Sequence, residues 1–345
     1  MFYSKKLRRR KIVACTGLIV LCTLTILNSD LSPDLYFIHW GPLENTTCHY
    51  METDGNLPRA DGKDFKPPAR SIFFHETSCS GELNSRQACA VESAARAHPD
   101  WQINVLFAAP VKDHTLKSGA VALLKNITNV KFLRVHIEKY AKGTPLESMV
   151  SGGALKRTRW RISHSSDVLR YLSLYKFGGV YLDLDVVVAK PFDSLVRNWA
   201  ARETAKSVAA GALAFSRDNV GREVADAAIR DMKSKYRGDV WGHNGPGVIT
   251  RVLTERCVGV KPTSMSIATC DGFEVYGPQF FYPIIYSNAS LYFKPGDVDE
   301  EIPYVFHVWN KLTSHLKVHP DSPYAKLARK YCPNVYRLYE VDFGL

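Results

Sequence analysis

The sequence predicts an α/β protein built on a mixed, mostly parallel sheet and preceded by an N-terminal membrane segment. From residue 71 onward, short apolar segments rich in β-branched residues alternate with segments of helical character, which is the pattern of parallel strands connected by covering helices. The 345 residues are 46% hydrophobic and 11% aromatic, so the chain can bury a sizeable core. An uncharged stretch also follows a strongly basic N-terminus.

The N-terminus has the pattern of a membrane anchor. Residues 1–11, MFYSKKLRRRK, contain six Lys and Arg and no acid, and residues 12–27, IVACTGLIVLCTLTIL, contain no charge. As a helix the second segment spans roughly 24 Å, which suits the thinner membranes of the early secretory pathway. We expect a cytosolic tail (1–11), a transmembrane signal-anchor (12–29) and a lumenal remainder. A cleaved signal peptide is the alternative, but no clear small-x-small site follows residue 27.

Glycosylation signals and cysteines agree with a lumenal location. Sequons occur at Asn45, Asn126 and Asn288, and their modification requires exposure to the secretory lumen. Six cysteines lie beyond the anchor without metal-finger spacing, and this even number is compatible with three disulfides. Fifteen pairings are possible. The ones we expect first are Cys79 with Cys89, Cys257 with Cys270, and Cys48 with Cys332.

The net charge does not indicate a nucleic-acid partner. The formal charge is +11, but six of these charges lie in residues 1–11, which leaves +5 for the rest of the chain. A modest positive balance is compatible with an anionic substrate or a membrane surface. We therefore expect no nucleic-acid binding.

A stem should separate the anchor from the folded domain. Residues 30–70 contain five prolines among polar residues, without sustained periodicity, which is typical of a linker. The lumenal folded domain is expected to span residues 71–345. No internal repeat or low-complexity tract interrupts it.

The domain begins with a strand, a helix and a second strand. SIFFHET (71–77) is apolar and aromatic, as strands are. SRQACAVESAARAHP (85–99) is rich in alanine and predicts a helix that ends at its proline. INVLFAA (103–109) predicts the second strand.

The alternation continues to residue 188 and then weakens. A helical piece around 115–125, a strand at 131–137, a helix at 166–177 and a strand at 180–188 follow in that order. Beyond residue 195 the pattern is less regular, with an aromatic region at 273–286 and a strand-like YVFHVW at 304–309. Ligands of such sheets gather at the carboxyl ends of the strands, and the last strand of the alternating part carries two aspartates.

Asp183 and Asp185 suggest a shared cation. In a continuous strand, residues i and i+2 face the same side, so GGVYLDLDVVV (178–188) would present both carboxylates together. Two close carboxylates in a low-dielectric setting suppress the ionisation of one, unless a cation neutralises both. Mg²⁺ and Mn²⁺ commonly use one or two carboxylates together with substrate phosphates. The alternative is an edge strand whose aspartates face water.

Asp167 and Arg170 lie just upstream on the predicted helix. At positions i and i+3 they share one face near its N-terminus. Taken alone, they are better explained as a surface ion pair. Gly178 and Gly179 supply the C-cap that ends this helix before the strand.

These segments together resemble a known family. The sequence SD-x-x-R, then GG-x-Y, then LD-x-D (166–185) is similar to the sugar-nucleotide signature of the glycosyltransferase family that contains α-1,4-galactosyltransferases acting on lactosylceramide and α-1,4-N-acetylglucosaminyltransferases. The resemblance covers most of residues 71–335. Further motifs that carry it are IFFHETS (72–78), CAVESAARAHP (89–99), TPLES (144–148), WGHNGPGVITRV (241–252), FYPI (281–284), HVWNK (307–311) and YCP (331–333).

The resemblance implies a GT-A fold and retaining transfer from a UDP-sugar with Mn²⁺ (or Mg²⁺). It implies that Asp167 and Arg170 hold the donor sugar and that Tyr181 lies near the sugar nucleotide. Asp183 would reach the ribose or donor sugar and the metal, and Asp185 would be the firmer metal ligand.

A third metal ligand is expected from the C-terminal part of the chain. His307 in HVWNK is the first candidate and Asn310 the second, since a neutral imidazole is a competent ligand. His307 also lies in an apolar segment, where a hydrogen-bonded core histidine is the alternative. Trp309 could cover the donor pocket or pack in the hydrophobic core.

For the transfer, the metal and Arg170 would stabilise the charge that grows on the departing diphosphate. WGHNGPG places Asn244 at a Gly-rich bend, where its amide could contact the sugar or the acceptor, and Asp239 is a weaker alternative. An amide is a poor nucleophile, so we expect attack by the acceptor on the face from which the diphosphate leaves. A turn that simply leads into a helix is the other explanation of this stretch.

The expected function is that of a single-pass type II enzyme of the Golgi membrane with a lumenal catalytic domain. It would move galactose, or N-acetylgalactosamine, from a UDP-sugar in α-1,4 linkage onto a glycosphingolipid such as lactosylceramide. The alternatives are an α-1,4-N-acetylglucosaminyltransferase acting on glycoprotein glycans and a non-catalytic lumenal carbohydrate-binding relic.

The first strand should border the uracil site. The side chain of His75 in this strand either points outward or makes a modified contact with the base of the nucleotide.

Overall fold

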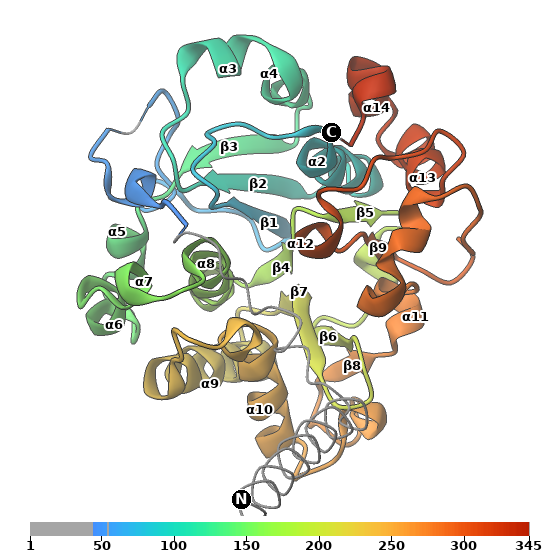
Figure 1. The fold of residues 1–345 in the computed structure, drawn as a ribbon. Helices are drawn as coiled ribbons and strands as arrows, with labels where there is room; N and C mark the ends of the chain where they lie inside the picture. The colour runs from blue at the N-terminus through green and yellow to red at the C-terminus, as the bar shows by residue number, and fades with distance from the viewer. Residues whose placement is uncertain (1–43, 54, 345) are drawn as a thin grey trace, which may run out of the picture.

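A seven-stranded mixed sheet forms the centre of the molecule (Figure 1), in the order β3-β2-β1-β4-β7-β6-β8. The computed structural model describes residues 44–53 and 55–344. Four of the six strand pairings are parallel, which confirms the α/β class and the mostly parallel sheet. The strands are β1 (Ser71–Glu76), β2 (Gln102–Phe107), β3 (Val130–Arg134), β4 (Gly179–Leu182), β6 (Trp199–Arg202), β7 (Val208–Phe215) and β8 (Glu274–Tyr276).

Helices cover both faces of the sheet, and a second sheet of two antiparallel strands, β5 (Val186–Val188) and β9 (Val305–His307), lies beside it. The helices before residue 180 are α2 (Ser85–Ala97), α3 (Asp113–Lys117), α4 (Gly119–Lys125), α5 (Ile137–Ala141), α6 (Glu147–Ser151), α7 (Ala154–Arg157) and α8 (Arg161–Phe177). Those that follow are α9 (Asn219–Lys235), α10 (Pro246–Arg256), α11 (Pro278–Phe281), α12 (Asn310–Thr313), α13 (Pro323–Tyr331) and α14 (Pro333–Tyr339).

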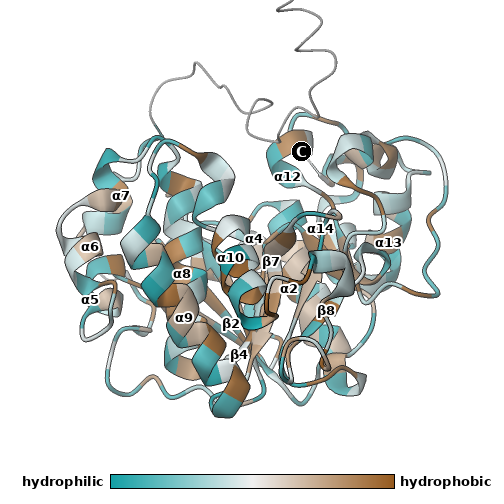
Figure 2. Ribbon diagram, turned by 90° about the horizontal axis from the view of Figure 1, so that it is seen from below, coloured by the Kyte–Doolittle hydropathy of each residue, from teal (hydrophilic) through white to brown (hydrophobic). Residues whose placement is uncertain are grey.

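Alternating side chains divide the core into two layers. In β1, Ile72 and Phe74 pack with α2, α4 and the small sheet, whereas Phe73 packs with α5, α8, α9 and α10. Brown, hydrophobic ribbon is prominent in the centre of the molecule, and the teal stretches lie mainly on the outer turns of the helices (Figure 2). Because the strands are covered on both faces, they read as continuous apolar runs in the sequence.

The two strands and the helix predicted between residues 71 and 109 are confirmed with small shifts of their ends, and the helical piece around 115–125 is two short helices, α3 and α4. Three later elements differ. The strand expected at 131–137 ends at Arg134, and α5 begins at Ile137. The helix expected at 166–177 begins one turn earlier, at Arg161, and ends at Phe177, where Gly178 caps it with a positive φ of 60° that glycine tolerates.

The strand predicted at 180–188 is in fact two strands. β4 ends at Leu182 in the large sheet, and β5 begins at Val186 in the small one. Asp183 to Asp185 form the turn between them, so the two aspartates do not share one face of a continuous strand. The residues before and after this turn are apolar and buried. The sequence pattern therefore does not show that the strand is interrupted.

Two of the three expected disulfides are wrong. The structure pairs Cys48 with Cys79 and Cys89 with Cys332, and it confirms Cys257 with Cys270. Nearness in sequence is a poor guide here, because α2 carries Cys89 into the core beside α14 while Cys79 stays in the loop after β1.

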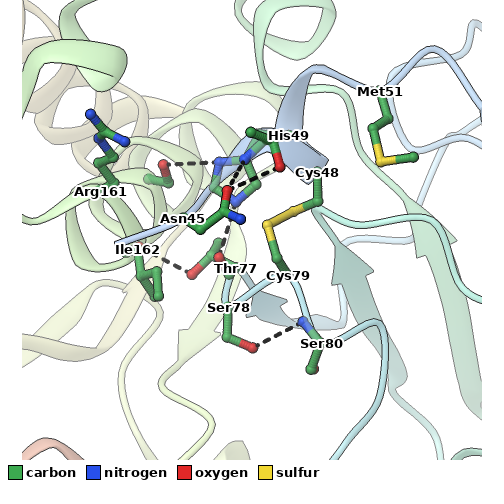
Figure 3. Close-up of a disulfide and its surroundings, with 12 residues drawn as sticks. Asn45, Cys48, His49, Met51, Thr77, Ser78, Cys79, Ser80, Arg161 and Ile162 are labelled. Carbon is green, nitrogen blue, oxygen red and sulfur yellow. Dashed lines mark hydrogen bonds between the residues drawn. A yellow bond between two sulfur atoms is a disulfide. The ribbon is translucent and has the colours of Figure 1, made fainter. Parts of the chain in front are cut away.

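The folded domain starts before Ser71, the predicted boundary. The Cys48–Cys79 disulfide ties the described part of the predicted stem to the loop after β1 (Figure 3). His49 is buried, and its Nε2 lies 3.0 Å from the Thr77 carbonyl (Figure 3). Residues 44–53 and 55–70 therefore pack on the domain, because buried contacts and a covalent bond outweigh the linker-like composition.

The predicted cytosolic tail (1–11) and signal-anchor (12–29) lie outside the described residues. Within the part of the chain that the structure describes, no helix has the length and apolar character that crossing a membrane requires. The sequon asparagines Asn45, Asn126 and Asn288 are all exposed.

The disulfides should differ in their effect on stability. Loop-closure entropy assigns about 5 kcal/mol to the Cys89–Cys332 bond, which closes a separation of 243 residues, and about 3 kcal/mol to Cys257–Cys270, which closes 13. Replacing each pair with alanines should therefore lower the free energy of unfolding more for the first pair, as measured by urea denaturation. A larger loss for the second pair would contradict this account.

Candidate active site

A cavity of about 290 Å³ opens beyond the carboxyl ends of β1 and β4. This is the edge at which ligands of open α/β sheets bind. Most of the residues singled out in the sequence line it together. They are Asp167, Arg170, Tyr181, Asp183, Asp185 and His307.

The break between β4 and β5 positions the two aspartates. The amide of Asp183 donates to the Gly211 carbonyl at 2.8 Å, which continues the pairing of β4 with β7. The carbonyl of Asp185 accepts from the Val308 amide at 2.9 Å, which begins the pairing of β5 with β9. Each aspartate is thus fixed by a different sheet.

The small sheet also brings His307 to the aspartates, since Val186 pairs with His307 in the antiparallel register. His307 Nε2 lies 3.2 Å from Asp185 Oδ1 and 3.5 Å from Asp183 Oδ2. One potential ligand atom from each of the three residues lies within 4.8 Å of the others. This arrangement fits a hard divalent cation.

One other group of potential ligand residues is found among the described residues, formed by Cys48, His49 and Cys79. Both cysteines are consumed by their disulfide. The group is therefore no metal site.

Arg170 joins the carboxylates on the other side of the cavity. Its Nη2 lies 3.1 Å from Asp167 Oδ1 and 3.3 Å from Asp183 Oδ1, and its Nη1 donates to the Ala210 carbonyl at 2.7 Å. Both Asp167 and Arg170 are buried. They are therefore not the surface ion pair that the sequence left open.

Tyr181 connects this pair to the aspartates. Its hydroxyl donates to Asp183 Oδ1 at 2.6 Å and lies 3.1 Å from Ser166 Oγ. The Arg170 guanidinium lies 4.6 Å from the centre of its ring. Burial and the neighbouring Asp183 raise the pKa of Tyr181 well above its usual value, so the hydroxyl stays a donor at neutral pH.

The carboxyl groups differ in how firmly they hold their charge. Burial raises the pKa of Asp167 to about 7, against the opposing effect of Arg170. Burial also acts to raise the pKa of Asp183, but Arg170 and His307 outweigh it and hold this pKa below its usual range. Burial raises the pKa of Asp185, partly offset by His307. Asp183 is thus the most firmly ionised of the three.

His307 has one nitrogen directed at the carboxylates and one at the backbone. The amide of Trp309 donates to Nδ1 at 3.2 Å, so a neutral ring carries its proton on Nε2, facing Asp185. Metal ligation by Nε2 calls for the opposite tautomer, with the proton on Nδ1, which gives up the hydrogen bond from the Trp309 amide. In the geometry seen, His307 is a hydrogen-bonded histidine, and a change of tautomer makes it a ligand.

Gly211 makes room for this cluster. A Cβ atom at this position would lie 2.8 Å from Asp183 Oδ2 and 3.2 Å from His307 Nε2. Any side chain would push the aspartate and the histidine away from each other. Glycine is needed here because Asp183 and His307 lie so close to its Cα atom, and not because of its backbone freedom.

Asn244 does not occupy the place expected of it. Its Oδ1 accepts from the Arg237 amide at 3.0 Å and its Nδ2 donates to the Arg237 carbonyl at 2.6 Å. It is fully buried and does not line the cavity. Asp239 is exposed and pairs with Arg237. The structure therefore corrects the catalytic expectation for Asn244, whose amide fixes the bend that leads into α10.

His75 lines the cavity and is buried, so it is not outward-facing. Its Nε2 lies 3.0 Å from Ser173 Oγ and its ring centre 5.1 Å from that of Tyr181. Burial, reinforced by Arg170, lowers the pKa of His75 to about 3. A neutral imidazole therefore faces the cavity beside Tyr181.

Three cavity residues were missed by the sequence reasoning. Tyr282 is buried with its ring centre 5.4 Å from that of His307, and its hydroxyl has no hydrogen-bond partner among the described residues. Glu203 accepts from Ser207 Oγ at 3.2 Å, and burial raises its pKa. Trp241 also lines the cavity. Tyr282 lies in the FYPI motif, which could have pointed to it, whereas Glu203 lies in a stretch without any signal.

Comparison with known proteins places the chain in a family. Residues 84–205 match the family model described as glycosyltransferase sugar-binding region containing DXD motif, and residues 218–339 match the alpha 1,4-glycosyltransferase conserved region. The first match contains both aspartates and the Asp167–Arg170 pair. The second contains His307.

Curated relatives agree with these matches. The lactosylceramide 4-alpha-galactosyltransferase of Mus musculus is 33% identical over 77% of this chain and 75% of its own length, and that of Homo sapiens is 32% identical over 78% and 77%. The alpha-1,4-N-acetylglucosaminyltransferase of Homo sapiens is 27% identical over 78% and 80%. A solved galactosyltransferase in complex with donor and acceptor sugar analogues is 17% identical, with a TM-score of 0.44 over 79% of this chain and 97% of its own, too weak a likeness to support an argument. The chain belongs to the family of α-1,4-glycosyltransferases that includes lactosylceramide 4-alpha-galactosyltransferase, and it is a glycosyltransferase.

Proposed function

We propose that the protein is a retaining galactosyltransferase that moves galactose, or N-acetylgalactosamine, from a UDP-sugar in α-1,4 linkage onto a neutral glycosphingolipid. The observation that carries this proposal is the single cavity in which the Asp167–Arg170 pair faces the Asp183, Asp185 and His307 cluster. The Asp167–Arg170 pair can hydrogen-bond a polar sugar. The cluster of Asp183, Asp185 and His307 can hold a metal ion that binds the diphosphate. The names of the relatives support lactosylceramide as the acceptor to test first.

The donor set fits a divalent ion, Mn²⁺ or Mg²⁺. Asp183 and Asp185 supply hard oxygen ligands, and His307 supplies an imidazole nitrogen within reach. When bound, such an ion would neutralise the diphosphate and stabilise its departure. Asp183 is held ionised by Arg170 and His307, which suits it to this task.

The chain's own residues orient the donor. Arg170 is fixed by three contacts at once, so its remaining donor surface and the Asp167 carboxylate present a rigid polar wall to the sugar. In the transfer, the acceptor hydroxyl oxygen bonds to the anomeric carbon as the bond from that carbon to the diphosphate oxygen breaks. The hydroxyl proton passes to the departing diphosphate, and UDP and the α-glycoside are the products.

The predicted anchor supplies the setting of this reaction. A type II protein of the Golgi membrane would keep the catalytic domain in the lumen and close to membrane-embedded acceptors. The exposed sequon asparagines Asn45, Asn126 and Asn288 support a lumenal position, since each is accessible for glycosylation.

The direct test is UDP release by the full-length chain in detergent with Mn²⁺. UDP-galactose, UDP-N-acetylgalactosamine and UDP-N-acetylglucosamine are each supplied with lactosylceramide. Acceptor-dependent release from one of the first two supports the proposal. Release from UDP-N-acetylglucosamine alone would favour the activity named for the second group of relatives, and release without any acceptor would indicate a hydrolase.

Asp185→Asn should abolish metal-dependent transfer. The change keeps the shape of the side chain but removes the charge beside His307, so kcat should fall by roughly 10²–10³ and the rise in Tm caused by Mn²⁺ should disappear. Asp226→Asn, at a partly exposed position on α9 outside the cavity, is the matched control. Full activity of Asp185→Asn would refute the metal assignment.

Arg170→Lys should separate donor binding from metal binding. Lysine keeps the charge but cannot contact Asp167, Asp183 and the Ala210 carbonyl together. We expect kcat/KM for the donor to fall about a hundredfold, while Mn²⁺ still raises the Tm. Arg230→Lys on α9 controls for the loss of an exposed guanidinium. Unchanged kcat/KM for Arg170→Lys would remove Arg170 from the donor site.

A further inference from the structure

Trp309 has an unusual backbone conformation at the edge of the cavity. Its φ and ψ angles are 57° and 51°, in the left-handed region. An L-residue in this region suffers a clash between its Cβ atom and the following carbonyl, which glycine avoids. Among the described non-glycine residues with positive φ, only Trp309 lines the cavity. Strained residues of this kind cluster at functional sites.

The left-handed turn directs the next amide toward the predicted metal ligands. It bends the chain directly after β9, so that α12 begins at Asn310. The Asn310 amide then donates to Asp185 Oδ2 at 2.7 Å, while Asp185 Oδ1 remains 3.2 Å from His307 Nε2. One carboxylate oxygen is thus held by the backbone, and the other faces the cavity.

The indole and the carbonyl of Trp309 hold this conformation in place. The indole Nε1 donates to the Ile284 carbonyl at 2.7 Å. The Trp309 carbonyl accepts from the amides of Leu312 at 2.8 Å and Thr313 at 3.0 Å. The side chain and the backbone are therefore fixed independently of each other.

The same indole supports His307. The ring centres of Trp309 and His307 are 4.4 Å apart, and Tyr282 approaches them at 5.5 Å and 5.4 Å. The imidazole is thus packed against two aromatic rings. Loss of the indole would remove the nearer of the two and weaken the restraint on the orientation of His307.

We propose that Trp309 is a positioning residue whose left-handed backbone aims the Asn310 amide at Asp185 and whose indole orients His307. This inference rests on the proposed function, because Asp185 and His307 act as metal ligands there. Trp309 itself coordinates nothing. Its effect on the metal is transmitted through Asp185 and His307.

Substitution by glycine and by alanine separates the two parts of this role. Both remove the indole, but only glycine adopts the left-handed conformation without the Cβ clash. In the full-length protein, Trp309→Gly should bind Mn²⁺ about tenfold more tightly than Trp309→Ala, measured by titration calorimetry and without any sugar nucleotide. Both variants should bind less tightly than the native protein, because the support for His307 is lost.

Unfolding of the metal-free variants supplies a second readout. At ordinary positions glycine is less stable than alanine, and the order is reversed where the native backbone is left-handed. The Tm of Trp309→Gly should therefore equal or exceed that of Trp309→Ala in the presence of EDTA. A lower Tm for the glycine variant would contradict the left-handed conformation itself.

Val258 provides the matched control. Its φ angle is 54°, and it is 88% exposed just after α10, outside the cavity. Val258→Gly and Val258→Ala should reproduce the glycine advantage in Tm and leave Mn²⁺ affinity unchanged. A difference in affinity at Val258 as large as that at Trp309 would show that the effect is one of stability alone.

The outcomes distinguish this inference from the proposed function. If the native protein fails to bind Mn²⁺ or Mg²⁺, the proposed metal site fails. If the native protein binds Mn²⁺ and the glycine and alanine variants bind it equally, the metal site stands and the positioning role of the Trp309 backbone is overturned.

Discussion

The mutual repulsion of three neighbouring carboxylates, one buried and two half-buried, is the constraint on which the rest of this site depends. Asp167, Asp183 and Asp185 face one cavity, where low polarity strengthens their repulsion. Arg170 stands between the first two and His307 against the last two. Arg170 is shared by Asp167 and Asp183, so its removal would leave their negative charge uncompensated, while Nε2 of His307 faces Asp183 and Asp185. A divalent ion held by Asp183 and Asp185 would add positive charge, and the diphosphate of a donor would balance it.

The fold satisfies this constraint by bringing separate elements to one point. Arg170 comes from the middle of α8, Asp183 from the end of β4 in the large sheet, and Asp185 from the start of the small sheet. β9 adds His307 by pairing with β5, and Gly211 in β7 leaves room for it. The backbone of Trp309 is left-handed, and the Asn310 amide that follows it donates to Asp185. The site therefore lies where two sheets, and not one, determine the positions of the ligands.

Much of this arrangement could be predicted from the sequence, and the exceptions have physical causes. Alternating apolar and helical segments gave the α/β class, and Asp183 and Asp185 were identified as a pair, although the turn between β4 and β5 was hidden by apolar residues on both sides. Asn244 was wrongly predicted to contact the substrate. The sequence does not distinguish a side-chain amide that hydrogen-bonds the backbone of its own loop from one that faces a ligand. The pairing of Cys89 with Cys332 and the presence of Glu203 in the cavity depend on tertiary packing, which local patterns do not encode.

The most direct measurement is anomalous diffraction at the manganese edge from crystals grown with Mn²⁺ and UDP. This account predicts one strong peak in the cavity, at about 2.0–2.3 Å from an Asp185 oxygen and from oxygens of the diphosphate. The Asp167–Arg170 pair should lie next to the position of the donor sugar. A manganese peak elsewhere on the protein, or UDP bound in the cavity without a metal contact to Asp185, would contradict it.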